Sequence, residues 1–104
     1  FKSEGNALPT PNLIISQVCK FYSIEEDVLR GTLKNKGTAE ARQVAIYLIR
    51  KLTNLSTPDI GKELNKDHST VIYSIKKVES ALKSGDKSLQ DHIRDITANI
   101  NASL

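Results

Sequence analysis

The chain has 104 residues, 38% of them hydrophobic, and its 15 Lys and Arg against 12 Asp and Glu give a net charge of +3. This length and composition predict one packed domain and exclude a disordered tail. No apolar run approaches the ~18 residues that span a bilayer, and no signal-peptide pattern opens the sequence, so we expect a cytoplasmic protein.

The first part of the sequence predicts a linker and an amphipathic helix. Residues 1–10 contain Gly, Asn, Ser and Pro without an apolar period, which is typical of a linker. Thr10 and Pro11 then supply an N-cap and a first-turn proline. Apolar residues recur every three or four positions over residues 11–22, which predicts a helix of about three turns.

A short helix, a loop and a long helix are expected next. Ser23 and Glu26 have the spacing of a capping box, which predicts that a short helix begins there. Residues 30–37 contain two glycines and no apolar period, so we expect a basic loop with few local restraints. The strongest amphipathic pattern follows over residues 39–55 and predicts the longest helix.

Three more helices are expected in the rest of the chain. A short helix begins beside Pro58 and ends at Asn65, and Asp67 caps the helix that follows. A last helix comes after Gly85. Because no segment alternates with the period of two that marks a strand, the prediction for residues 11–104 is an all-α domain of about six helices.

The basic residues are concentrated in the middle of the chain. Residues 30–54 carry six basic side chains against one acidic side chain, whereas residues 1–29 and 78–104 each have a small acidic excess. Such a distribution favours a polyanionic partner. A solvated helix face gives the same pattern, so charge alone does not identify the partner.

The stretch that begins at Ile60 has the pattern of a helix-turn-helix. Apolar pairs four residues apart share one face of each of two successive helices, Ile60 with Leu64 and Val71 with Ile75. Gly61 has no side chain, so the two helices can cross closely. A tight pair of this kind is a helix-turn-helix, although an ordinary corner between two bundle helices shows the same apolar spacing.

Polar residues beside this pattern favour DNA binding. His68, Ser69 and Thr70 fill the first turn of the second helix, directly after the Asp67 cap. In helix-turn-helix proteins this turn points into the major groove, and the free N–H groups of a helix start also favour phosphate. Outside this motif, His68 would be interpreted as an exposed histidine.

The sequence gives no support for catalysis or for a metal. Asp67, His68 and Ser69 are neighbours on a helix, so their side chains diverge by ~100° and cannot form a triad. The glycine-containing loop lacks the Lys-Ser/Thr that follows a phosphate-binding loop. His92 has no metal-ligand spacing with other ligands, and Cys19 falls beside an apolar face. We therefore expect no catalytic residue, metal or cofactor in this chain.

Four short runs point together to a family. They are residues 41–48 (ARQVAIYL), 52–56 (LTNLS), 60–61 (IG) and 67–71 (DHSTV). In this order and spacing they resemble the C-terminal DNA-binding domain of the bacterial replication initiator DnaA, over about residues 11–83. The resemblance implies a Trp-repressor-like helix-turn-helix fold, preceded by a linker helix at residues 11–22.

The resemblance also implies which residues contact DNA. The positions that read bases in the family correspond here to Asp67, His68, Ser69, Thr70, Pro58 and Lys34. The positions that contact phosphate correspond to Arg42, Gln43, Arg50 and Lys36. Most of the base readers face the major groove, whereas Lys34, in the basic loop, enters the minor groove. Family members often have arginine in place of Lys34 and Arg-Pro in place of residues 40–41, and this chain departs from both patterns.

The partners that the resemblance implies are double-stranded DNA and other parts of a longer protein. The DNA sites would be asymmetric boxes of nine base pairs at the chromosomal origin. Because the sequence contains no methionine, even at position 1, we expect a longer protein, whose ATPase domain binds ATP or ADP and self-assembles. Residues 11–22 are amphipathic with Lys20 near their end, so contact with acidic phospholipid is a further expectation.

Two alternatives remain open at this point. The first is a transcriptional or transposase-associated helix-turn-helix protein. The second is a different class, a membrane-surface or protein-docking helical module, because residues 11–22 are amphipathic. A salt-dependent shift with duplex DNA, and none with anionic vesicles, separates the DNA-binding class from the membrane class. The family interpretation places the protein in the cytoplasm, associated with the nucleoid.

Overall fold

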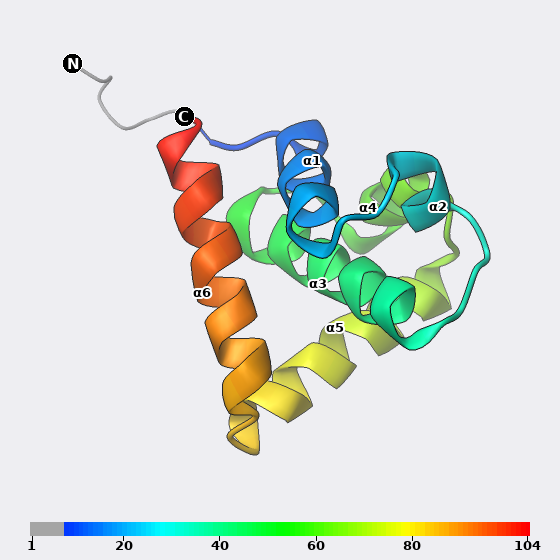
Figure 1. Cartoon of the computed structure of the whole chain (residues 1–104). Helices are drawn as coiled ribbons and strands as arrows, with labels where there is room; N and C mark the ends of the chain where they lie inside the picture. The colour runs from blue at the N-terminus through cyan, green and yellow to red at the C-terminus, as the bar shows by residue number, and fades with distance from the viewer. Residues whose placement is uncertain (1–7) are drawn as a thin grey trace.

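The computed structural model describes residues 8–104, so most of the predicted linker, residues 1–7, lies outside the described residues. The described part forms six α-helices and no strand, as Figure 1 shows. The helices are α1 (Pro11–Tyr22), α2 (Glu26–Arg30), α3 (Lys36–Leu52), α4 (Thr57–Leu64), α5 (His68–Lys83) and α6 (Lys87–Ala102). The predicted all-α class with about six helices is confirmed. None of these helices is long and apolar enough to cross a membrane.

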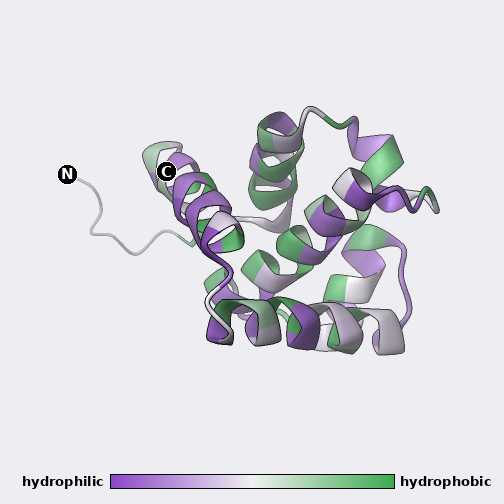
Figure 2. Cartoon of the chain, turned by 60° about the horizontal axis from the view of Figure 1, so that its bottom comes forward, coloured by the Kyte–Doolittle hydropathy of each residue, from purple (hydrophilic) through white to green (hydrophobic). Residues whose placement is uncertain are grey.

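Helix α3 lies at the centre of the domain. It packs against α1 and α5, and α2 and α4 also contact it, while α6 runs from the end of α5 back to α1 (Figure 1). Because α3 has neighbours on two sides, Ile46 and Ile49 are fully buried together with Ala41, Val44 and Ala45 of the predicted apolar face. Figure 2 shows hydrophilic and hydrophobic residues alternating along the helices, as expected of amphipathic elements around one core.

Most helix starts have the side-chain cap that the local sequence favours. Thr10, Asn35, Ser56, Asp67 and Asp86 each accept a hydrogen bond from the backbone N–H three residues later. Such a cap satisfies one of the free donors of the first helical turn and contributes about 1 kcal/mol. The caps therefore fix where α1, α3, α4, α5 and α6 begin.

The capping box predicted at Ser23 is wrong. Ser23 ends α1 in the left-handed conformation, with φ of 57°, and its N–H donates to Lys20 O over 3.3 Å. Helix α2 begins later, at Glu26, and its N-cap Glu25 makes no side-chain cap bond. The Ser23 backbone is thus used to turn the chain out of α1, which leaves its hydroxyl outside the start of α2.

The bounds predicted for the basic loop and the long helix also need correction. Helix α3 begins at Lys36 because Asn35 accepts a 2.9 Å hydrogen bond from Thr38 N, so Gly37 lies in the first helical turn. The connection between α2 and α3 is therefore residues 31–35. At the other end α3 stops at Leu52, three residues before the predicted end.

Candidate nucleic-acid interface

Helices α4 and α5 form the predicted helix-turn-helix, with a three-residue turn at residues 65–67. Asn65 adopts the left-handed conformation, with φ of 58°, and Lys66 N donates to Gly61 O over 2.8 Å. A Cβ atom at Gly61 would lie 2.5 Å from the backbone oxygen of Lys66. The close crossing that the sequence predicted at Gly61 is confirmed, since any side chain there would collide with the turn.

The first turn of α5 presents polar groups outward. Asp67, His68 and Ser69 are exposed, and Thr70 is half-buried. Asp67 Oδ1 accepts from Thr70 N over 2.8 Å, and the hydrogen bonds from Thr70 lower the pKa of Asp67 below its usual value. The carboxylate is therefore held in its charged form at the start of the helix, where the helix dipole also favours a negative charge.

The ring of His68 is tied to α4. His68 Nδ1 lies 3.2 Å from Thr57 Oγ1, so the first residue of α4 orients the imidazole at the start of α5. With Nδ1 occupied in this way, Nε2 is the ring nitrogen available to a ligand. Pro58 follows Thr57 and is exposed. Sequence reasoning missed the Thr57 contact, because the two residues are eleven positions apart.

A groove of about 800 Å³ brings residues from three separate elements together. Its lining includes Lys34 from the loop, Gln43 from α3, and Asp67, Ser69 and Thr70 from the helix-turn-helix. Arg42 from α3 also lines it, so six predicted site residues surround one opening. A molecule that enters it meets the loop on one side and the first turn of α5 on the other.

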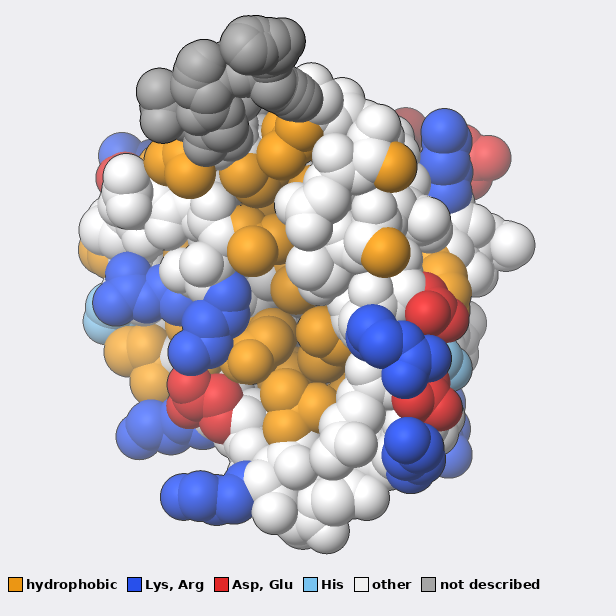
Figure 3. All heavy atoms as spheres, turned by 90° about the vertical axis from the view of Figure 1, so that its left-hand side faces the viewer, with side chains coloured by type: hydrophobic (Ala, Val, Ile, Leu, Met, Phe, Trp, Pro, Cys, Tyr) orange, Lys and Arg blue, Asp and Glu red, His pale blue; other side chains and the backbone are white. Residues whose placement is uncertain are grey.

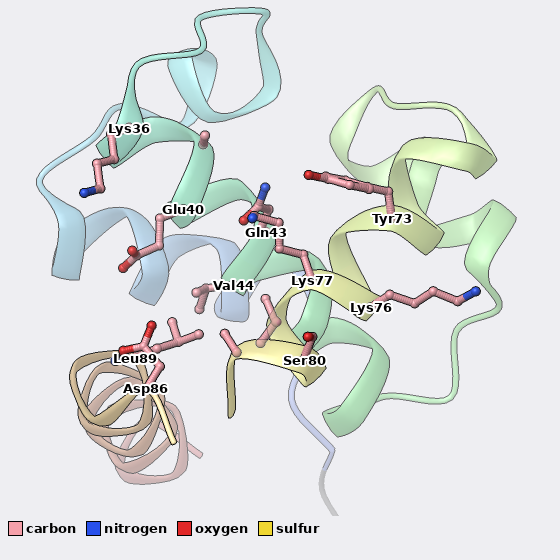
Figure 4. Close-up of a pocket in the computed structure, with 13 residues that line it drawn as sticks. Lys36, Glu40, Gln43, Val44, Tyr73, Lys76, Lys77, Ser80, Asp86 and Leu89 are labelled. Atoms are coloured by element: carbon pink, nitrogen blue, oxygen red, sulfur yellow. Dashed lines mark hydrogen bonds between the residues drawn. The ribbon is translucent and has the colours of Figure 1, made fainter. Parts of the chain in front are cut away.

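A second groove, of about 730 Å³, lies next to the first between α3, α5 and α6. Lys36 and Gln43 line it, so Gln43 belongs to both grooves. Figure 4 shows that Lys77 points toward Gln43, whereas Lys76 points away from the hollow. Lys36 is thus placed beside the first groove and not inside it.

Arg50 lies apart from both grooves, near the C-terminal end of α3. It is exposed, its Nη1 donates to Leu55 O over 3.1 Å, and it borders a smaller hollow of about 450 Å³ with Thr57 and Lys76. Because Thr57 also contacts His68, this hollow adjoins the start of α5. The predicted phosphate contacts are therefore distributed around α5.

Arg42 differs from the other predicted contacts because it is buried, with 7% of its surface exposed. Its Nε donates to Leu29 O over 2.7 Å, and its Nη2 donates to Val28 O and Leu33 O over 3.2 and 3.1 Å. Burial lowers the pKa of this guanidinium. The structure thus gives Arg42 a set of internal partners that sequence reasoning missed.

Lys66 is a second residue that the sequence reasoning missed. Its Nζ donates to the carbonyl oxygens of Arg30 and Gly31. Burial and then the positive charges of Arg42 and Lys34 lower the pKa of Lys66. Three cationic groups thus gather at one side of the groove, an arrangement that favours an anionic ligand.

Tyr73 is the third missed residue. Its side chain is 59% exposed, and it lines both grooves beside Gln43 (Figure 4). A signal for it was available, because Tyr73 follows Thr70 by three residues and therefore lies on the same side of α5 one turn later. Its hydroxyl and ring extend the polar surface of the first helical turn.

Comparison with known proteins agrees with this geometry. Residues 11–78 match a family described as the bacterial dnaA protein helix-turn-helix. The chain is 42% identical over 91 residues to the chromosomal replication initiator protein DnaA of Caldanaerobacter subterraneus subsp. tengcongensis, covering 88% of this chain and 20% of that protein. The protein of the same name from Thermoanaerobacter sp. is 41% identical over the same shares.

A third relative, the chromosomal replication initiator protein DnaA of Mycobacteroides abscessus, is 38% identical over 87 residues, covering 84% of this chain and 18% of that protein. The chain thus spans about a fifth of the length of the curated relatives it matches. The family match covers more than half of the chain and contains α4, the turn at residues 65–67 and α5 as far as residue 78. This chain belongs to the bacterial DnaA helix-turn-helix family.

Proposed function

We propose that this domain binds double-stranded DNA in a sequence-specific manner at boxes of nine base pairs in a replication origin, and so positions an initiator for the start of chromosomal replication. The observation that carries the proposal is the groove that Lys34, Gln43, Asp67, Ser69 and Thr70 line together. Residues from three separate elements meet there beside an exposed helix start. Family membership supports the same function.

The first turn of α5 enters the major groove. Exposed hydroxyl, imidazole and carboxylate groups can hydrogen-bond with base edges, which differ for each base pair in that groove. Asp67, His68, Ser69 and Thr70 supply these groups, and the contact with Thr57 leaves Nε2 of His68 facing outward. Pro58 adds an apolar contact from α4, beside the same turn.

The basic loop meets the adjacent minor groove, where Lys34 is the contacting residue. Lys34 lines the same groove of the protein as Ser69 and Thr70, so one duplex can be contacted in two places. A narrow minor groove over A·T pairs concentrates negative potential and attracts a cation. Gln43, Lys36 and Arg50 contact phosphates around these two points and set the register of the protein on DNA.

The activities of a whole initiator belong to the same proposal. An ATPase domain outside this chain binds ATP or ADP and drives self-assembly, and this domain supplies the DNA contact in the cytoplasm at the nucleoid. Contact of residues 11–22 with acidic phospholipid would require α1 to leave the core, because Ile14, Ile15 and Val18 are fully buried. The proposal therefore assigns α1 chiefly to connecting the two domains.

Binding of the purified domain to three probes tests the proposal. The probes are a duplex with the nine-base-pair box, a scrambled duplex of equal length, and anionic vesicles. We expect the box to bind at least about a hundredfold more tightly than the scrambled duplex, with affinity falling steeply as salt rises. Equal affinity for the two duplexes, or tighter binding to vesicles, would contradict it.

A further inference from the structure

Arg42 connects three segments of the chain from inside the domain. It extends from α3 and donates to Val28 O and Leu29 O in α2, and to Leu33 O in the loop of residues 31–35. Every nitrogen on one side of its guanidinium, Nε and Nη2, is occupied by these carbonyl oxygens. That is the edge with which arginine makes a side-on bidentate contact to phosphate, so such a contact would require the internal bonds to break. Arg42 also lines the groove beside Lys34, and within residues 8–104 its Nη1 makes no hydrogen bond.

The loop depends on this arginine because it has few bonds of its own. In the described part of the chain, no backbone N–H of residues 32–34 donates a hydrogen bond. Gly31 N donates to Val28 O at the start of the loop, and Asn35 caps α3 at its end. Between these two points, the Leu33 carbonyl is held by Arg42, directly before Lys34.

A second set of bonds joins the same loop to the helix-turn-helix. Lys66, in the turn before α5, donates to the carbonyl oxygens of Arg30 and Gly31, and Arg30 Nε donates to Glu63 O over 2.9 Å. The start of the loop is thereby fixed relative to the turn. Arg42 then fixes the middle of the loop relative to α3, which leaves Lys34 at a defined distance from the first turn of α5.

We propose that Arg42 is a positioning residue: it holds the loop so that Lys34 meets the minor groove while the first turn of α5 meets the major groove. This inference rests on the proposed DNA binding. It replaces the phosphate contact that family resemblance implies for Arg42 with an action through the loop. Lysine should not substitute in this role, because its one ammonium group lacks the two separate nitrogens with which Arg42 reaches Leu29 O on one side and Val28 O and Leu33 O on the other.

The first test is the conservative substitution Arg42→Lys, compared with Arg42→Gln. Lys34→Ala first identifies the base pair of the box whose identity affects binding through Lys34. Three box duplexes then carry A·T, I·C or G·C at that pair. The I·C pair resembles A·T in the minor groove and G·C in the major groove, because inosine lacks the 2-amino group. The unsubstituted protein should prefer A·T and I·C over G·C, and both Arg42 variants should lose that preference and bind about tenfold more weakly. Affinity and preference retained in Arg42→Lys would overturn the inference.

A double-mutant cycle separates action through the loop from direct contact. If Arg42 acts through Lys34, adding Arg42→Gln to Lys34→Ala should weaken box binding less than twofold further and leave the salt dependence unchanged. A direct phosphate contact predicts additive losses and a fall of about 0.9 in the log–log salt slope. Arg94→Lys, at an exposed arginine on α6 that lines neither groove, is the matched control and should retain the groove preference.

A measurement without DNA keeps the inference distinct from the proposed function. In NMR relaxation of the free protein, the amides of residues 32–34 should be more mobile in Arg42→Gln than in the unsubstituted chain, while those of α5 stay unchanged. Unchanged loop amides would overturn the positioning role. If the unsubstituted protein does not distinguish box from scrambled DNA, the proposed function fails, and the loop measurement still shows whether Arg42 fixes the loop. If the variants do not fold, the NMR chemical shift of the Arg42 Nε–H group in the unsubstituted protein provides the test. This chemical shift should stay the same when box DNA is added, and a change would contradict the inference.

Discussion

The helix-turn-helix side and the α6 side of the domain use their charged groups differently. On α6, Arg94 bonds to Asp91 over 3.0 Å and Lys87 lies 3.7 Å from the same carboxylate. Figure 3 shows basic and acidic side chains next to one another on that side, around a central apolar strip. Around the loop, by contrast, Lys34 and Lys36 make no ion pair within residues 8–104. The positive charge available to a polyanion is therefore local, and the net charge of +3 understates it.

The same contrast applies to hydrogen-bonding groups. Where α1, α3 and α6 meet, Tyr22 Oη donates to Glu40 Oε2 over 2.7 Å, and His92 Nδ1 lies 3.2 Å from the same oxygen. These groups join α1, α3 and α6, and burial and then the Glu40 contact raise the pKa of Tyr22. On the helix-turn-helix, Ser69 and the outer nitrogen of His68 face outward. Tyr22, Glu40 and His92 thus bond to one another within the fold, whereas the Ser69 hydroxyl and the outer nitrogen of His68 bond to no group within residues 8–104.

The largest effect should come from Gly61→Ala, which disrupts the close packing of α4 against the turn before α5. The new Cβ would lie 2.5 Å from Lys66 O, so the turn must move. We expect a loss of roughly 3 kcal/mol of unfolding free energy, the upper range for forced overpacking, together with loss of box binding. Gly37→Ala is the control, because its Cβ would meet only Asn35 Oδ1 at 3.9 Å. Urea unfolding measures both, and equal stability of the two variants would contradict the close crossing.

His68→Ala should have the next largest effect, and it should act on binding and not on stability. Loss of a base-edge contact costs about 1–3 kcal/mol on the box duplex and far less on scrambled DNA. Thr57→Val removes the partner that orients the ring and should cost less than His68→Ala. Equal losses on both duplexes would show that His68 is not a base reader. Titration calorimetry on the two duplexes provides the comparison.

Tyr22→Phe tests the other region and should have the opposite signature. It removes the hydrogen bond to Glu40 and leaves the ring in place, so unfolding free energy should fall by about 1 kcal/mol. Box affinity should stay within twofold of the unsubstituted protein. A larger change in affinity would mean that α1 and the DNA-binding region are coupled through Glu40, and that the two regions are not independent.

Sequence reasoning predicted correctly the features that depend only on residues close together in the chain. The caps at Asp67 and Thr10, the end of α4 at Asn65 and the close approach at Gly61 were all predicted correctly, because each depends on residues a few positions apart. The error at Ser23 has a similar origin: the box spacing was present, but the end of α1 used that backbone for its own turn.

Long-range contacts were outside the reach of the same reasoning. Nothing within a few residues of Arg42 indicates that it is buried, because its partners lie nine to fourteen positions earlier. The same holds for Glu40, at a position where members of the family often have arginine. Its partners Tyr22 and His92 are 18 and 52 positions away in the sequence. The structure explains this departure as a contact between helices.

The smallest expected effects come from one substitution made at equivalent caps in the two regions. Asp67→Asn and Asp86→Asn both keep an oxygen that can cap the helix, of α5 and α6 respectively. Only Asp67 lines the groove beside Lys34. We therefore expect Asp67→Asn to weaken box binding a few fold and to raise affinity for scrambled DNA slightly, because a negative charge near the phosphates is lost. Asp86→Asn should change neither affinity, and a similar change in both variants would contradict the assignment of Asp67 to the interface.

Acid titration then separates the role of Asp67 as the cap of α5 from its proposed contact with DNA. Because hydrogen bonds from Thr70 lower the pKa of Asp67, its charged form stabilises the folded state. That contribution is fully present above the ordinary value of 3.8 and is lost as the pH falls through the lower value of the folded state. Urea unfolding between pH 5 and pH 2 should therefore show a smaller acid-induced loss in Asp67→Asn than in the unsubstituted chain. A parallel decline in the two proteins would mean that the Thr70 bonds do not depend on the charge, and that Asp67 owes its place at the helix start to the ligand alone.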